Sequence, residues 1–166
     1  MRLADLNALD DEEAVRAFLR CCGSSQWARR MAAARPFASV EAMAVDADAI
    51  WQALDRVDWL EAFAAHPEIG AGGVGTAWSD QEQAAVAVAA GQTRRGLAAA
   101  NRDYRARFGY IFIICASGKT GDEMLARLEA RLPNDPEKEL RISAEEQRKI
   151  TQLRLTKLLE QEPDAR

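Results

Sequence analysis

The sequence predicts an all-α protein, a compact single-domain helical bundle with one short extended segment near residues 110–116. Alanine and leucine are abundant, while only 10 glycines and 5 prolines interrupt the 166 residues, and this balance favours helix. β-Branched residues rarely occur together, which argues against strands. With 48% hydrophobic residues the chain can build one core, so we expect residues 1–166 to form a single domain.

Four helices are expected in the first 66 residues, and they begin near Asp10, Ser25, Ser39 and Asp58. After each start, apolar residues recur at helical intervals, and the side chains of Asp10, Ser39 and Asp58 can serve as N-caps. The second helix must end before Pro36, because proline cannot continue a helix. The fourth ends at Ala65 and His66, since Pro67 disfavours the α conformation of the preceding residue. His66 is therefore expected at a helix exit.

A glycine-rich stretch follows at residues 70–75. A nucleotide-binding loop would need a preceding strand in a βαβ unit, and the segment before these glycines is helical, so that function is disfavoured. A long helical region then opens at Ser79 and ends at Gly109, a residue type that tolerates the left-handed conformation of a helix terminus. Tyr110–Cys115 is a short, unbroken apolar run, which predicts a buried extended segment.

Two more helices complete the expected fold. Thr120 and Glu123 have the spacing of a capping box, which predicts a helix start. The turn at residues 134–136 restarts the chain in a final long helix. This helix is expected to reach Glu162, because every glycine in the chain lies at or before Gly121. The charged tail after residue 159 is expected to fray.

Charge and hydropathy exclude several classes of partner. The net charge is -4, and the 22 basic and 26 acidic residues are spread along the chain, so no cationic stripe is available to bind a nucleic-acid backbone. No apolar run approaches the ~20 residues needed to cross a bilayer. The first residues lack a signal-peptide pattern and the last lack a peroxisomal address, so a cytoplasmic location is expected.

Cysteine and histidine usage limits the chemistry. The three cysteines, Cys21, Cys22 and Cys115, are odd in number and include an adjacent pair, which suits neither a disulfide framework nor a Cys-x-x-Cys metal site. Reduced, buried thiols are expected. Because His66 is the only histidine, a zinc site built on two imidazoles is excluded.

Three local features contain side chains suited to catalysis: His66 before Pro67, the group Ser79, Glu82 and Gln83, and the apolar run from Phe112 to Ala116. Each has an ordinary alternative interpretation. A lone histidine is more often structural than catalytic, and Ser79 with Glu82 is by itself a capping box. The apolar run alone is simply core, and the charged residues between Asn101 and Phe108 alone indicate a solvated helix face.

Taken together, these segments resemble the OHCU decarboxylases, which act on 2-oxo-4-hydroxy-4-carboxy-5-ureidoimidazoline. The family pattern has His-Pro-x-(Ile/Leu)-Gly, then Ser-x-x-Glu-Gln, then Asn-x-x-Tyr followed by Phe-Gly-x-x-Phe. The matching residues occur here in the same order: His66, Pro67, Ile69, Gly70, Ser79, Glu82, Gln83, Asn101, Tyr104, Phe108, Gly109 and Phe112. The likeness extends from about Phe18 to Leu158 and includes Arg131, Glu139 and Arg154.

The resemblance implies a helical bundle, usually a homodimer, that makes (S)-allantoin during urate degradation without a metal or organic cofactor. His66 is the implied catalytic acid. The implied substrate-binding residues are Pro67, Ser79, Asp80, Gln81, Glu82, Gln83, Phe112, Ile113, Ile114, Cys115, Ala116 and Arg154. The chain departs from the family after Gly70, where relatives often carry Lys or Arg in a longer connection.

The residues suit this chemistry. The substrate carries a carboxylate and a hydroxyl on one ring carbon beside a C=N bond, so the electrons released with carbon dioxide have a sink and no cofactor is required. An imidazole that titrates near neutral pH can move the hydroxyl proton, while Glu82 orients or charges either the imidazole or a substrate nitrogen. Gln83 and Ser79 offer hydrogen bonds to the polar ring system. Backbone groups of residues 112–116 are expected to bond ring amides, while Phe112 and Ile114 exclude water.

Two other functions remain open at this point. A relative with the same fold can act as a decarboxylase on another ureido or imidazolinone acid, which would retain His66 and Glu82 but alter the pocket lining. A helical interaction module, in which the motifs are only caps and core, would tolerate substitution of His66. An assay of (S)-allantoin formation separates these alternatives from the OHCU reaction.

Overall fold

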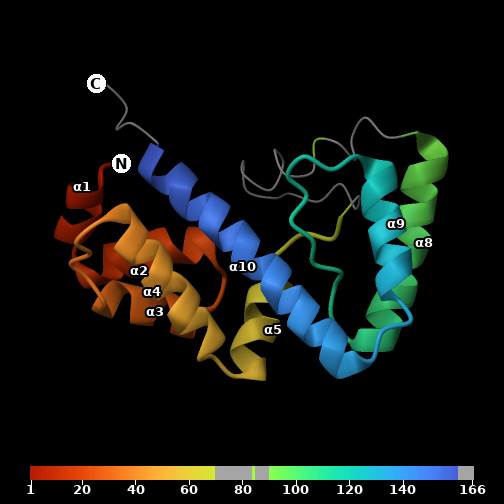
Figure 1. Ribbon diagram of the computed structural model, residues 1–166, viewed down its shortest axis with the longest axis horizontal. Helices are drawn as coiled ribbons and strands as arrows, with labels where there is room; N and C mark the ends of the chain where they lie inside the picture. Colours follow the sequence, from red (N-terminus) through yellow and green to blue (C-terminus); the bar gives the residue numbers. More distant parts are fainter. Residues whose placement is uncertain (70–83, 85–89, 161–166) are drawn as a thin grey trace. The chain divides into compact units, whose positions relative to one another are not determined.

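The computed structural model describes residues 1–69, residue 84 and residues 90–160, and within these ranges all regular structure is α-helical (Figure 1). The helices are α1 (Leu3–Ala8), α2 (Asp11–Cys21), α3 (Ser25–Ala33), α4 (Val40–Gln52), α5 (Arg56–Ala64), α8 (Gly91–Phe108), α9 (Gly121–Arg131) and α10 (Pro136–Glu160). The predicted all-α class is confirmed. None of the described helices is both long and apolar enough to span a membrane.

The chain divides into two compact units. The first consists of Met1–Ala62 with Arg148–Arg166, and the second of Phe63–Gln147, so α10 contributes a segment to each. The single-domain organisation stays a prediction. The glycine-rich stretch, the group from Ser79 to Gln83 and the tail after Glu160 lie outside the described residues.

Helix starts in the first unit follow the local capping signals. Asp10 Oδ1 accepts from the Glu13 N–H at 2.8 Å and Ser39 Oγ from the Ala42 N–H at 3.1 Å, which confirms two predicted caps. The second helix begins at Ser25 as expected, capped by the preceding serine. The prediction for Asp58 is wrong, because α5 already begins at Arg56.

Aromatic packing holds the first unit together, where α2 packs against α3 and α3 against α4. The ring of Phe18 on α2 lies edge-on to Trp27 at 5.9 Å and to Phe37 at 6.2 Å. Trp27 is fully buried, and its indole N–H donates to the Ala47 carbonyl at 3.1 Å. The C-terminal part of α10 is tied to α4 through Asp48, which accepts from Arg148 and Gln152.

The second unit pairs α8 with α9, which lie side by side in Figure 1. They approach closely at Gly96, where an added Cβ would come within 2.9 Å of Leu125. Gly109 ends α8 with φ +82°, as predicted from its position, and its N–H donates to the Arg105 carbonyl. The capping box of Thr120 and Glu123 at the start of α9 is also confirmed.

The segment after Gly109 has no regular secondary structure, and residues 110–116 are all buried. The predicted extended core segment is therefore confirmed. Its aromatic residues continue the buried cluster of α8, with ring centroids of Tyr104 and Phe112 5.3 Å apart and those of Tyr104 and Phe108 4.6 Å apart. The final helix begins at Pro136, as the preceding turn predicts.

Candidate active site

His66 lies just beyond the end of α5, as predicted, and is half-buried together with Pro67. Its backbone N–H still donates to the Phe63 carbonyl at 3.2 Å. The last turn of α5 therefore fixes the backbone of the histidine, while Pro67 turns the chain away from the helical path.

The imidazole meets α10 in the second unit. His66 Nε2 lies 2.6 Å from Oε1 of Gln147, and Gln147 is fully buried. The next residue back on α10, Glu146, accepts the Cys115 N–H at 2.8 Å. Two adjacent side chains of one helical turn thus connect two predicted parts of the site, the histidine and the extended segment.

Sequence reasoning assigned no role to Gln147 or Glu146. A signal was present, because the buried stripe of α10 carries polar residues at helical spacing, namely Ser143, Gln147, Thr151 and Arg154. Polar side chains at core positions need hydrogen-bond partners from other segments. The spacing therefore marks candidate positions, although it does not identify their partners.

The extended segment already uses part of its backbone for internal hydrogen bonds. The Ile113 carbonyl accepts from Arg131 at 2.8 Å, and the Cys115 carbonyl accepts from Lys119 Nζ at 2.9 Å. The Cys115 N–H is bonded as well, to Glu146 of α10. The role of residues 112–116 in binding substrate stays a prediction.

A buried ion pair holds this segment in place. Arg131 Nη2 lies 2.6 Å from Glu139 Oε1, and the glutamate side chain is fully buried. Tyr104 also donates to Glu139, at 2.6 Å, and Ser143 accepts from Arg131 at 3.0 Å. The guanidinium carbon stands 4.4 Å from the centroid of the Phe112 ring. Such a pair is tolerated inside a protein because further hydrogen bonds satisfy both ions.

The electrostatics of Tyr104 follow from this network. Burial raises the pKa of its phenol well above the usual range, and the hydrogen bond to Glu139 raises it further. Tyr104 therefore stays protonated and acts as a donor to the carboxylate. The network matches residues named for the family resemblance, but the sequence did not reveal that they touch.

Arg154 belongs to the first unit, where it is buried on α10. The thiols of Cys21 and Cys22 lie in the same unit, and burial raises their pKa values to about 12 and about 11, although the charge of Arg154 opposes the change. Both thiols and that of Cys115 are free and buried, as predicted. The role of Arg154 as a substrate-binding residue stays a prediction.

The remaining predicted site residues, Ser79, Asp80, Gln81, Glu82 and Gln83, lie outside the described residues. The chain leading toward them is anchored at Ile69, whose carbonyl accepts from Asn101 Nδ2 at 2.9 Å. Within the described ranges, no group of three or more His, Cys, Asp or Glu side chains is placed to hold a metal ion.

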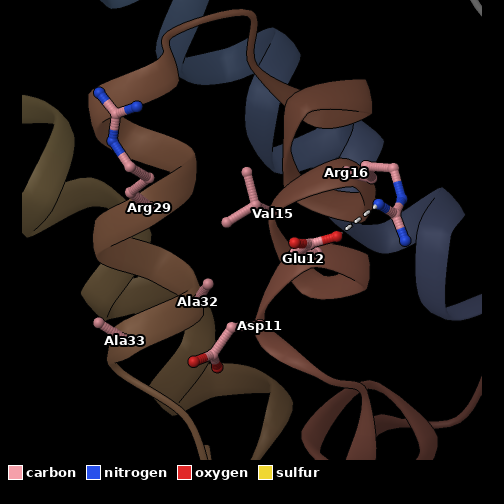
Figure 2. A pocket seen from close by; sticks show the side chains of 7 residues that line it. All are labelled: Asp11, Glu12, Val15, Arg16, Arg29, Ala32 and Ala33. Carbon is pink, nitrogen blue, oxygen red and sulfur yellow. Dashed lines mark ion pairs between the residues drawn. The ribbon is translucent and has the colours of Figure 1, made fainter.

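Two open surface pockets are lined by residues that are distant from His66 in the sequence. One of about 520 Å³ separates α2 from α3, with Val15 directed between the helices and Arg16 turned to pair with Glu12 (Figure 2). The other, of about 670 Å³, lies along α9 and the residues before it and is lined in part by Lys119, Arg127 and Arg131. Neither contains His66. Within the described residues, the fold is all-helical, and its second unit holds the one histidine of the chain against a buried amide of α10.

Comparison with known proteins identifies the family. The family model for OHCU decarboxylase matches residues 7–156. The chain is 43% identical over 145 residues to the uric acid degradation bifunctional protein TTL of Arabidopsis thaliana, covering 83% of this chain and 45% of that protein. It is 30% identical to the 2-oxo-4-hydroxy-4-carboxy-5-ureidoimidazoline decarboxylase of Haloferax volcanii, covering 93% of this chain and 94% of that one.

A solved structure agrees with this result. A crystal structure of OHCU decarboxylase in the presence of (S)-allantoin superposes with a TM-score of 0.79 at 40% identity, covering 92% of this chain and all of the other. The chain belongs to the OHCU decarboxylase family.

Proposed function

We propose that this protein decarboxylates OHCU to (S)-allantoin during urate degradation. The observation that carries the proposal is the placement of His66, the one imidazole of the chain. It stands at a helix exit, held by a buried amide from the helix that also anchors the extended segment. The substrate, OHCU, is inferred from membership of the decarboxylase family.

The reaction needs control of protons and of orientation. Loss of carbon dioxide breaks the bond between the carboxylate and the ring carbon. The released electron pair forms a C=C bond to the neighbouring ring carbon, and the π electrons of its C=N bond pass to the nitrogen, which takes up a proton. The resulting enol then loses its hydroxyl proton, and the neighbouring carbon gains one. His66 moves these protons, since an imidazole both accepts and donates near neutral pH. Delivery from one side gives a single enantiomer.

Glu82 is the proposed partner of His66, either through direct contact or through the substrate. Ser79 and Gln83 are proposed to bond the polar ring, together with Pro67, Asp80 and Gln81. The segment Phe112–Ala116 is proposed to contribute backbone groups that bond ring amides, while Phe112 and Ile114 exclude water. Arg154 is a further proposed contact. We also propose that the protein is a cytoplasmic homodimer, which light scattering would contradict by giving a monomer mass at micromolar concentration.

The test is an assay on freshly generated substrate, with circular dichroism used to follow (S)-allantoin. The wild-type protein should accelerate the spontaneous decay, and a chelator should leave the rate unchanged. The His66→Asn variant should lose about 10²- to 10⁴-fold in turnover, the range for a positioned acid–base group. Adding Glu82→Gln should cost little more if both side chains serve one step.

Each result has a contrary outcome. A fully active His66→Asn protein would end the assignment. Wild-type turnover in Glu82→Gln would remove Glu82 from the mechanism, because glutamine keeps a side chain able to complete a capping box. A wild-type protein that leaves OHCU decay unchanged but decarboxylates a related ureido acid would move the activity to that substrate.

A further inference from the structure

The contact between His66 and Gln147 indicates which nitrogen of the imidazole carries the hydrogen. The imidazole Nε2 lies 2.6 Å from the amide oxygen of Gln147. A carbonyl oxygen only accepts hydrogen bonds, so the hydrogen between these atoms belongs to the imidazole. In the neutral ring only one nitrogen carries hydrogen, and the other is then the base.

We propose that Gln147 is a positioning residue that fixes neutral His66 in the Nε2–H tautomer and so assigns proton transfer to Nδ1. The inference rests on the proposed function for its catalytic meaning, although the tautomer itself is a property of the free protein. Under this proposal, Gln147 influences the reaction by positioning His66 and does not itself contact the substrate.

The surroundings of Gln147 support this role. The side chain is fully buried on α10, so few rotamers are open to it. The preceding residue, Glu146, is held by the Cys115 N–H at 2.8 Å, which anchors the same helical turn to the extended segment. The acceptor for His66 is therefore built into the core rather than placed on a loose surface.

The chemical type of the acceptor also has a consequence. A carboxylate at this position would fix the same tautomer, but its charge would favour the imidazolium and raise the pKa of the imidazole, so that the ring would hold its proton too tightly to return it. A neutral amide selects the tautomer with less bias toward the charged form. Gln147 thus leaves His66 able to accept a proton and to return it.

The tautomer can be measured directly, because His66 is the only histidine and every imidazole signal belongs to it. The protein is labelled with ¹⁵N-histidine, and the two ring nitrogens are observed by NMR at a pH where the ring is neutral. In the wild type, Nε2 should show the shift of a protonated nitrogen and Nδ1 that of an unprotonated one. The reverse pattern, or an equal mixture, would overturn the proposal.

Variants at position 147 test the cause. Gln147→Leu removes the acceptor and should move the ring toward a mixture of tautomers, with a fall in kcat of about tenfold, the order expected for one hydrogen bond. Gln147→Glu restores an acceptor and should restore the Nε2–H pattern at a pH where its ring is neutral. An unchanged tautomer in Gln147→Leu would contradict the proposal. If Gln147→Leu does not fold, the wild-type spectrum and Gln147→Glu still decide.

A matched control lies on the same helix. Gln152 also has a bonded side-chain amide, which donates to Asp48 and to the Ala44 carbonyl. Gln152→Leu should leave the tautomer of His66 unchanged. The two proposals fail separately, because a wild-type protein with the expected tautomer but no decarboxylase activity would reject only the function.

Discussion

The apolar core of the first unit and the extended segment of the second unit are stabilised by different interactions. In the first, helices meet through large apolar side chains, with Phe18, Trp27 and Met31 fully buried. In the second, the extended segment at residues 110–116 depends on an internal ion pair, in which Arg131 binds both Glu139 and the Ile113 carbonyl.

The difference matters because the two forces constrain geometry differently. Apolar burial is non-directional and scales with area, so it stabilises a fold without fixing one backbone group to a particular place. A hydrogen bond requires a narrow range of distance and angle. We therefore expect substitutions in the apolar core of the first unit to change stability alone, and substitutions in the polar network of the second unit to change stability and turnover together.

The largest effect should come from Arg131→Met. It removes the cation from fully buried Glu139 and the donor from the Ile113 carbonyl, and breaking a buried ion pair costs about 3–5 kcal/mol. Urea unfolding should show this loss, and kcat should fall at temperatures where the variant is folded. Arg127→Met, an exposed arginine on the same helix, is the matched control and should change neither. A loss below about 1 kcal/mol would mean that the pair does not hold the segment.

The corresponding change in the first unit is Met31→Ala. Met31 is fully buried on α3, and truncation of a buried methionine costs about 2–5 kcal/mol. The same unfolding experiment should show this loss, but kcat should equal that of the wild type while the protein is folded. If kcat falls as far as in Arg131→Met at equal stability, the contrast between the two units is wrong.

The smallest expected effect is a loss of stability at alkaline pH, caused by the two adjacent free thiols of the first unit. The pKa values of Cys21 and Cys22 rise from 9.0 to about 12 and about 11 on burial. Between these limits the folded chain keeps protons that the unfolded chain loses, so the free energy of unfolding falls as pH rises above about 9. The loss is at most ~1.4 kcal/mol per pH unit for each thiol.

Thermal unfolding at pH 8 and pH 10 checks this expectation, with Cys22→Ala as the comparison. The variant starts from a lower Tm because it lacks the buried sulfur, but its Tm should fall less between the two pH values. An equal fall in both proteins would show that the Cys22 thiol does not contribute to alkaline instability.

Much of the local structure was predictable because its signals act within one helical turn. Asp10, Ser39 and Thr120 cap helices three residues ahead of the N–H groups that they bind. Pro67 places His66 at a helix exit through a steric effect on its immediate neighbour. The start of α5 at Arg56 shows the limit of such signals. Asp58 has a side chain suited to an N-cap, but residue type alone does not show that the helix begins earlier.

The sequence by itself therefore indicated most of the described helices, although not α1 at Leu3–Ala8, together with the buried segment at residues 110–116 and the one imidazole. Only the tertiary structure decided what that imidazole touches, because Gln147 is 81 residues away in the chain. The same holds for Arg131, which reaches Ile113 across 18 residues. A polar residue on the buried face of a helix needs a hydrogen-bond partner, and its position in the sequence shows this need. A hydrogen bond forms only when donor and acceptor come within about 3 Å of each other. Which partner comes that close depends on how the whole second unit packs.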